Sequence, residues 1–247
     1  MPPSSLDLDP AVVLALSERL EALDTCVVSD AMDRLGLSGA LPGIKPVWAC
    51  GRVAGPVRTM RLRRVTTNEV TPPPQVHLGC RVIERSRPGD VIIVEHQSRF
   101  DSAGWGGLLS AAASARQVRA VIVDGACRDV EQSEEFGLPL FARSSTPVSA
   151  RGRTVEVAVD EPITVSGCRI TAGDYIVADR NGVVVIGQAH LQDVLSRAED
   201  MDAREQAMLV SIRSGTPVSE VMDARYEAMT RVNVVDQSDQ ESEAASP

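Results

Sequence analysis

The first stretch able to do chemistry is Asp124-Gly125-Ala126-Cys127-Arg128-Asp129, which follows a short apolar run typical of a buried strand. Ligands of open α/β sheets bind beyond the carboxyl ends of the strands. Arg128 offers a planar fork for a carboxylate, and Asp129 offers a hard oxygen for a divalent cation. An arginine–aspartate dipeptide is also typical of a helix cap with an intrahelical ion pair, and this structural interpretation stays open.

The second stretch is Gly104-Trp105-Gly106-Gly107, directly before a predicted helix over residues 108–117. Glycines at a helix start let exposed N–H groups approach an anion, and the helix dipole adds to the attraction. A carboxylate or a phosphate is the ligand expected there, although a closely packed helix entry has the same pattern. Leu109 occupies the third glycine position of a GxGxxG pattern, so a dinucleotide site is not indicated.

The third stretch, residues 95–101, contains His96 near the predicted end of a strand. His96 is a candidate for proton transfer near neutral pH, although a hydrogen-bonded structural histidine is the commoner case. His77 and His190 are weaker candidates, and the three histidines lack the spacing of a zinc site. Cys127 has no paired base in the sequence, which favours a packing role over nucleophilic catalysis.

The composition narrows the chemistry further. Lys45 is the only lysine among 25 Lys and Arg residues, and it lies in a proline-flanked loop, so Schiff-base catalysis is not expected. A net charge of −9 argues against nucleic-acid binding, and no apolar run is long enough to span a membrane. The N-terminus lacks the basic region of a signal peptide, and five scattered cysteines suit a reducing compartment. We therefore expect a cytoplasmic protein.

Alternating strands and helices must hold the three stretches together. Strands at 90–95, 120–123 and 138–141 alternate with helices at 108–117 and 128–136, which predicts a parallel sheet with right-handed crossovers. The candidate residues then meet at one edge of that sheet. We expect a single domain over residues 1–231 and a disordered acidic tail over 232–247. The other predicted elements are helices at 10–23, 25–35, 189–214 and 218–229, and strands at 53–62, 154–159, 163–165, 175–177 and 183–186.

Four motifs together resemble the RraA-like family, which contains the regulator of ribonuclease activity and class II 4-hydroxy-4-methyl-2-oxoglutarate / 4-carboxy-4-hydroxy-2-oxoadipate aldolases. The resemblance covers about residues 25 to 230. It implies an α/β fold of the swivelling phosphohistidine-domain type, a β/β/α sandwich with C-terminal helices. It also implies a homotrimer or homohexamer with sites between subunits. The motifs are Thr25-Cys26-Val27-Val28-Ser29-Asp30-Ala31-Met32, Gly104-Trp105-Gly106-Gly107-Leu108-Leu109, Asp124-Gly125-Ala126-Cys127-Arg128-Asp129 and Ala178-Asp179-Arg180-Asn181-Gly182-Val183-Val184-Val185.

The resemblance also implies a mechanism in which pyruvate is released from a 2-keto acid with the help of Mg²⁺ or Mn²⁺. Asp129 would hold the metal within a water-rich shell, and Arg128 would bind the keto-acid end. Gly106 would line the substrate site, and the amides of Gly107, Leu108 and Leu109 would cradle the carboxylate. Glu205, from the C-terminal helix of a neighbouring subunit, would complete the metal's surroundings. A metal-assisted reaction needs no lysine, in agreement with the composition.

One position departs from the family pattern. Aldolases of the family carry an acidic residue where this chain has Gly107, and losing such an outer carboxylate typically lowers metal affinity or activity about 10–100-fold. The sequence therefore predicts a metal-dependent 2-keto-acid lyase, of the pyruvate aldolase or oxaloacetate decarboxylase type. The alternative is a non-catalytic regulator that binds a protein partner. A methyltransferase is disfavoured because no nucleotide-binding glycine loop is evident.

Overall fold

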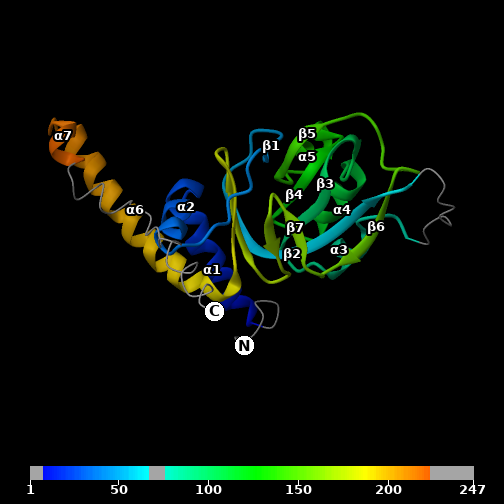
Figure 1. Cartoon of the computed structure of the whole chain (residues 1–247), viewed down its shortest axis with the longest axis horizontal. Coiled ribbons are helices and arrows are strands. Elements are labelled where there is room, and N and C mark those ends of the chain that lie inside the picture. The colour runs from blue at the N-terminus through cyan, green and yellow to red at the C-terminus, as the bar shows by residue number, and fades with distance from the viewer. Residues whose placement is uncertain (1–7, 67–75, 223–247) are drawn as a thin grey trace, which may run out of the picture.

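The computed structural model describes residues 8–66 and 76–222 of the chain (Figure 1). Its helices are α1 (Pro10–Ala22), α2 (Thr25–Arg34), α3 (Cys80–Arg85), α4 (Gly107–Ala115), α5 (Val130–Glu135), α6 (Leu191–Arg213) and α7 (Val218–Val221), with a 3₁₀ turn at Gln188–His190. Its strands are β1 (Lys45–Pro46), β2 (Val53–Arg64), β3 (Val91–Ala103), β4 (Ala120–Cys127), β5 (Leu140–Ser145), β6 (Thr154–Val159), β7 (Ile163–Val165), β8 (Cys168–Ile170), β9 (Tyr175–Asp179) and β10 (Gly182–Ile186).

The predicted parallel sheet is confirmed. Strands β3, β4 and β5 are paired in parallel, and α4 and α5 provide the crossovers between them. Strand β2 joins this unit in parallel at β3 and pairs antiparallel with β6 and β9. Every residue of β4 is buried, which explains its continuous apolar run. The strand order in the main sheet is β1-β5-β4-β3-β2-β9-β10.

The packing separates into three buried clusters on different parts of the sheet. One packs α1, α2 and α6 against β9 and β10, and a second includes β7 and β8. The third lies between the parallel strands and the helices α3 and α4. Its largest side chain, Trp105, is 1% exposed and stands just before α4. This third cluster forms the base on which the candidate site is built.

Local signals account for the helix starts at the N-terminus. The side chain of Asp9 accepts a hydrogen bond from the amide of Ala11, and Pro10 occupies the first helical position. Asp24 caps α2 in the same way through the amide of Val27. Helix α2 stops before Gly36, which has a φ of 69°. The predictions for both helices are confirmed.

Two predicted element bounds need correction, and one helix was not predicted. Strand β3 does not end at residue 95 but continues through Ala103, with two shifts of register against β4. Helix α5 begins at Val130, so Arg128 and Asp129 precede it. Helix α3 was not predicted, since it has only six residues and so little room for a helical repeat. The acidic tail at 232–247 and most of the helix predicted at 218–229 lie outside the described residues.

Helix α6 leaves the body of the molecule. Its first half packs on α2, and its second half extends away from the sheet toward α7 (Figure 1). No helix within residues 8–66 and 76–222 combines the length and apolar character needed to cross a bilayer. All five cysteines are free, as their spacing predicted.

Candidate functional site

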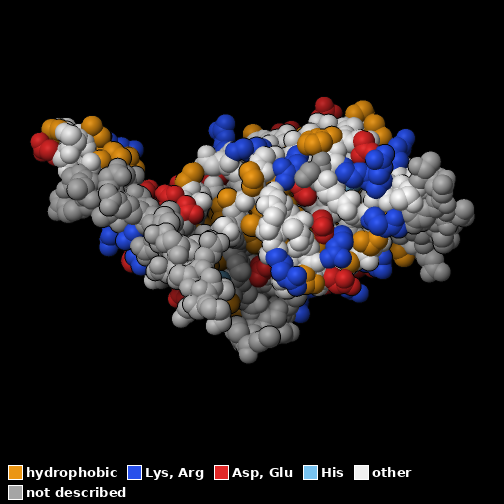
Figure 2. All heavy atoms as spheres, viewed as in Figure 1, with side chains coloured by type: hydrophobic (Ala, Val, Ile, Leu, Met, Phe, Trp, Pro, Cys, Tyr) orange, Lys and Arg blue, Asp and Glu red, His pale blue; other side chains and the backbone are white. Residues whose placement is uncertain are grey.

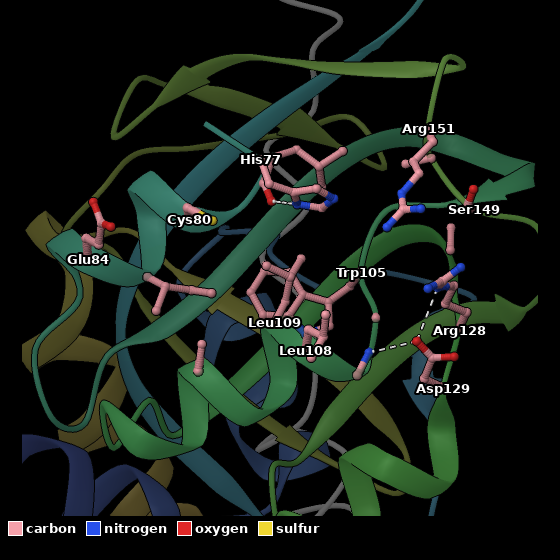
Figure 3. A pocket seen from close by; sticks show the side chains of 17 residues that line it. His77, Cys80, Glu84, Trp105, Leu108, Leu109, Arg128, Asp129, Ser149 and Arg151 are labelled. Carbon is pink, nitrogen blue, oxygen red and sulfur yellow. Dashed lines mark hydrogen bonds and ion pairs between the residues drawn. The ribbon is translucent and has the colours of Figure 1, made fainter. Parts of the chain in front are cut away.

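A cavity of about 420 Å³ opens where α4 and α5 begin (Figure 3). Its walls come from the segment that leads into α3, the start of α4, the loop between β4 and α5, and the loop after β5. Of the predicted site residues, six line it together: Gly106, Gly107, Leu108, Leu109, Arg128 and Asp129. The sheet edge therefore brings the first two chemical stretches of the sequence into one site.

Asp129 links the two stretches. Its Oδ2 atom accepts a hydrogen bond from the amide of Gly107 at 2.9 Å and lies 3.1 Å from Nε of Arg128. Its backbone is left-handed, with φ 57° and ψ 45°, and its carboxylate makes no capping bond to α5. The amide of Arg128 donates to the carbonyl of Trp105 at 3.0 Å. The alternative of an intrahelical ion pair is therefore wrong, because Arg128 and Asp129 both precede α5. The hydrogen bond from Gly107 joins their loop to the start of α4.

The left-handed conformation of Asp129 is a local strain. A non-glycine residue in this region costs about 1–3 kcal/mol and persists only where its surroundings fix it. Here the hydrogen bond from Gly107 and the contact with Arg128 hold Asp129 in this conformation. Strain of this kind collects at functional sites, which supports the assignment of this corner as one.

Side chains of the β4–α5 corner pack closely against both glycines. A Cβ atom on Gly106 would lie 3.0 Å from Oδ2 of Asp129, and one on Gly107 would lie 1.6 Å from Oε1 of Gln132. The amide of Gly107 is already used by Asp129, so its predicted role in holding a substrate carboxylate is not what this structure shows. The first-turn amides of Leu108 and Leu109 have no intrahelical acceptor and stay available for an anion.

His96 does not line the cavity. Because β3 continues past it, His96 lies inside a strand and is 1% exposed. Its Nε2 atom is 2.7 Å from the carbonyl oxygen of Ser102. Burial is the main cause that lowers the pKa of this imidazole below its ordinary value, which favours the neutral form. The predicted catalytic role of His96 is not supported by its position.

Glu205 lies on α6, which packs on α2 and lies away from α4 (Figure 1), and it does not line the cavity of its own chain. Partial burial and the nearby carboxylates of Asp24, Asp30 and Asp202 raise its pKa. The cavity and Glu205 meet only if a second chain supplies the helix. Its predicted role as a ligand from a neighbouring subunit stays a prediction.

The donor set suits a hard, hydrated cation. No group of three or more His, Cys, Asp or Glu side chains in the described residues is arranged to hold a metal ion. Asp129 keeps one carboxylate oxygen, Oδ1, without a hydrogen bond from the described residues, since both of its contacts use Oδ2. Mg²⁺ commonly binds through one or two carboxylates and keeps several waters. Among the described residues, Asp129 is the carboxylate that lies beside Arg128 and the start of α4, where such an ion would be needed.

Several lining residues were missed in the sequence. Trp105 packs under the cavity and donates from Nε1 to Oγ of Ser110 at 3.1 Å. His77 and Arg151 come from segments without regular spacing, so no periodic signal marked them. In Figure 3 the guanidinium group of Arg151 points to the same end of the cavity as Arg128.

The structure agrees with two exclusions made from the sequence. Lys45 is bonded to the carbonyl of Asn181 and does not line this cavity. Burial raises the pKa of the Cys127 thiol to about 12, so it stays protonated and unreactive at neutral pH. Neither Lys45 nor Cys127 lines the cavity.

Comparison with known proteins relates this chain to one family. The family model described as RraA-like, Aldolase/RraA, matches residues 25–185. A protein of Halalkalibacterium halodurans, provisionally named a 4-hydroxy-4-methyl-2-oxoglutarate aldolase, is 30% identical over 194 residues, which is 77% of this chain and 87% of that protein. Protein DlpA of Legionella pneumophila is 28% identical over 209 residues, 84% of this chain. The matched part is only 33% of DlpA's length.

Solved structures confirm the predicted α/β fold. The crystal structure of Streptomyces coelicolor RraAS2 is described as an unusual member of the RNase ES inhibitor RraA protein family. It superposes with a TM-score of 0.69 and 24% identity, over 78% of this chain and 94% of that one. At this identity the similarity establishes the fold alone.

Proposed function

The chain belongs to the RraA-like family, and we propose that it is a divalent-metal-dependent lyase that cleaves 2-keto acids and releases pyruvate. The observation that carries the proposal is the joint placement of Arg128, Asp129 and the start of α4 on one cavity. A guanidinium group, a carboxylate and free helix amides are together suited to hold an acid and a hard cation. The relatives named as aldolases point to the same reaction class.

Each residue has a role that follows from its position. The amides of Leu108 and Leu109 hold the substrate carboxylate at the positive end of α4. Arg128 binds the keto-acid end and stabilises the negative charge that develops on the 2-keto oxygen. The amide of Gly107 fixes Asp129, which would hold the cation. A bound Mg²⁺ or Mn²⁺ would supply Lewis-acid polarisation of that oxygen.

The cleavage balances without an added reactant. In an aldol cleavage the bond between C3 and C4 breaks, and the 4-hydroxyl oxygen becomes a carbonyl as its proton leaves. The electron pair passes to C3 and the 2-keto oxygen, and C3 then takes up a proton to give pyruvate. Trp105 and Leu109 form an apolar wall beside Arg128, which strengthens its interaction with the developing charge.

The test is pyruvate release, measured by NADH oxidation in the presence of lactate dehydrogenase. Oxaloacetate and 4-hydroxy-4-methyl-2-oxoglutarate are offered separately with Mg²⁺, with Mn²⁺ and with EDTA. Metal-dependent release that is lost in Arg128→Ala supports the proposal. Release that is unchanged by EDTA, or by Arg128→Ala in a folded protein, overturns it. No release from either acid, together with no metal binding by calorimetry, would favour the regulator alternative.

A further inference from the structure

The cavity has two chemically different ends. One carries the guanidinium groups of Arg128 and Arg151, and the other lies against α3 (Figure 3). Between them the wall is apolar, with Trp105 and Leu109 at its centre. The apolar surface continues toward α3 through Leu78, Ile83, Leu108, Leu109 and Ala112.

The α3 end of the cavity disfavours negative charge. Glu84 is the one charged side chain that α3 contributes to the lining. Burial, followed by the charges of Glu84 and Glu156, raises the pKa of the Cys80 thiol at this end. An anion placed there would meet the same burial and the same carboxylates.

Two arginine side chains near α3, Arg81 and Arg116, already bind other groups of the protein. Nε of Arg81 lies 2.6 Å from a carboxylate oxygen of Glu156. Arg116 donates to the backbone carbonyls of Ile83 and Glu84 and does not line the cavity. Among residues 8–66 and 76–222, no arginine or lysine lines this end, so a second substrate carboxylate would meet no such cation, whereas a hydrocarbon group would meet an apolar wall.

We propose that this site accepts 4-hydroxy-2-oxo acids whose distal group is a hydrocarbon, and discriminates against acids with a second carboxylate there. The inference rests on the proposed lyase function and concerns its substrate class. The keto-acid end lies at Arg128, and the hydrocarbon lies along α4 toward α3. The cavity volume of about 420 Å³ is within the range of small-molecule sites.

The experiment compares two acids that differ in one group. 4-Hydroxy-2-oxohexanoate ends in a methyl at C6, and 4-hydroxy-2-oxoadipate ends in a carboxylate at the same carbon. Each is cleaved between C3 and C4, giving pyruvate with propanal or with 3-oxopropanoate. We expect kcat/KM for the hexanoate to be higher by about 10-fold or more, since a distal carboxylate would lie against the apolar wall and be repelled by the like charge of Glu84.

The outcomes separate the inference from the proposed function. Faster cleavage of the adipate overturns the substrate class while leaving the lyase in place. Pyruvate from neither of these acids, nor from oxaloacetate, removes the lyase itself. Equal rates for the two acids also overturn the inference, because the α3 end then makes no distinction.

Matched variants test where the hydrocarbon lies. Ala112 is exposed on α4 and lines the cavity, whereas Ala115 is exposed on the same helix and does not. Ala112→Leu should lower kcat/KM for 4-hydroxy-2-oxooctanoate about 10-fold more than kcat/KM for the shorter oxaloacetate, because the leucine fills the distal space. Ala115→Leu should change neither. An unaltered octanoate rate in folded Ala112→Leu would overturn the placement.

A charge reversal tests the electrostatic half of the inference. Glu84→Arg places a cation at the α3 end, and we expect it to raise kcat/KM for the adipate about 10-fold relative to the hexanoate. Glu84→Gln should give a smaller change in the same direction. If the ratio of kcat/KM for the adipate to kcat/KM for the hexanoate is unchanged in both variants, the assignment of Glu84 to this end is contradicted.

Discussion

The role of Asp129 in metal binding can be tested by removing its charge alone. Asp129→Asn keeps an oxygen that can accept from the amide of Gly107, so the loop should hold its shape while the site loses a negative charge. We expect the Mg²⁺ concentration for half-maximal pyruvate release to rise about 10-fold or more. The measurement is a metal titration of the coupled assay.

Glu131 offers a control for that variant. It lies in the first turn of α5, two residues from Asp129, and does not line the cavity. Glu131→Gln removes a charge of the same sign two residues away, and its metal titration should match that of the unmodified protein. A titration of Asp129→Asn that overlays the control would exclude Asp129 as a ligand.

Gly107 is the position at which the chain departs from the aldolase pattern, and Gln132 occupies the space next to it. The Gln132 side chain is exposed, so it can rotate away when position 107 gains a side chain. Gly107→Asp should therefore fold and should lower the Mg²⁺ requirement by about 10-fold, by returning an outer carboxylate. Thermal unfolding checks the fold, and the metal titration checks the effect. A raised requirement would mean that the glycine is needed for the Gly107–Asp129 hydrogen bond.

Site residues could be predicted from the sequence where a recognisable strand or helix positions them. Arg128 and Asp129 could be predicted because they follow a buried strand, and such positions meet at one edge of a parallel sheet. Trp105 and Arg151 could not be assigned to the cavity, since a buried tryptophan and a loop arginine have no spacing that points to a site. His96 was placed at a strand end because the polar residues after 95 hide the continuation of β3.

At the scale of elements, Asp179 joins the end of β9 to the start of α2. Its carboxylate accepts from the amide of Thr25 at 3.0 Å, from Oγ1 of Thr25 at 2.7 Å and from the amide of Asn181 at 2.7 Å. Burial alone would raise its pKa, but these bonds and the charge of Arg52 hold the pKa of Asp179 below its ordinary value. The ionised carboxylate is therefore part of the folded state.

The sign of the pH effect follows from that lowered pKa. A carboxylate with a lower pKa in the folded state stabilises it above the unfolded pKa of about 4, and the contribution is lost as pH falls through the folded value. We expect Asp179→Asn to reduce the free energy of unfolding by about 1–3 kcal/mol at pH 7, and less below pH 4. Urea unfolding at several pH values measures this. Asp200→Asn, at an exposed position on α6, is the control, and an equal loss at every pH would contradict the argument.

Elements with a strong apolar run or a clear cap were predictable, whereas some short elements without such a signal were not. The apolar runs of β3 and β4 and the capped starts of α1 and α2 carry strong local signals. Strand β8, of three residues, leaves no pattern that stands above its surroundings. The same holds for α3, although it forms one wall of the cavity. The fold class therefore follows from the sequence, while the shape of the distal wall depends on tertiary packing.

At the scale of the molecule, the projecting end of α6 exposes apolar side chains to solvent. Val210 is 65% exposed on α6, and Val218 on α7 is 58% exposed. Hydrophobic side chains gather at this outer end of the molecule (Figure 2). Exposed apolar groups on a projecting helix favour contact with another chain. A second chain in contact with α6 is also what a shared site with Glu205 requires.

A subunit-mixing experiment tests the shared site directly. Arg128→Ala removes the substrate group, and Glu205→Gln removes the charge predicted to come from a neighbouring chain, so each variant alone should have little activity. If each site takes Arg128 from one chain and Glu205 from another, random co-assembly of equal amounts restores both residues at about one quarter of the sites. We therefore expect co-expressed variants to recover about one quarter of the unmodified pyruvate release, with light scattering showing a trimer or hexamer. Activity no higher than the mean of the two variants would show that Arg128 and Glu205 do not act in one site built from two chains.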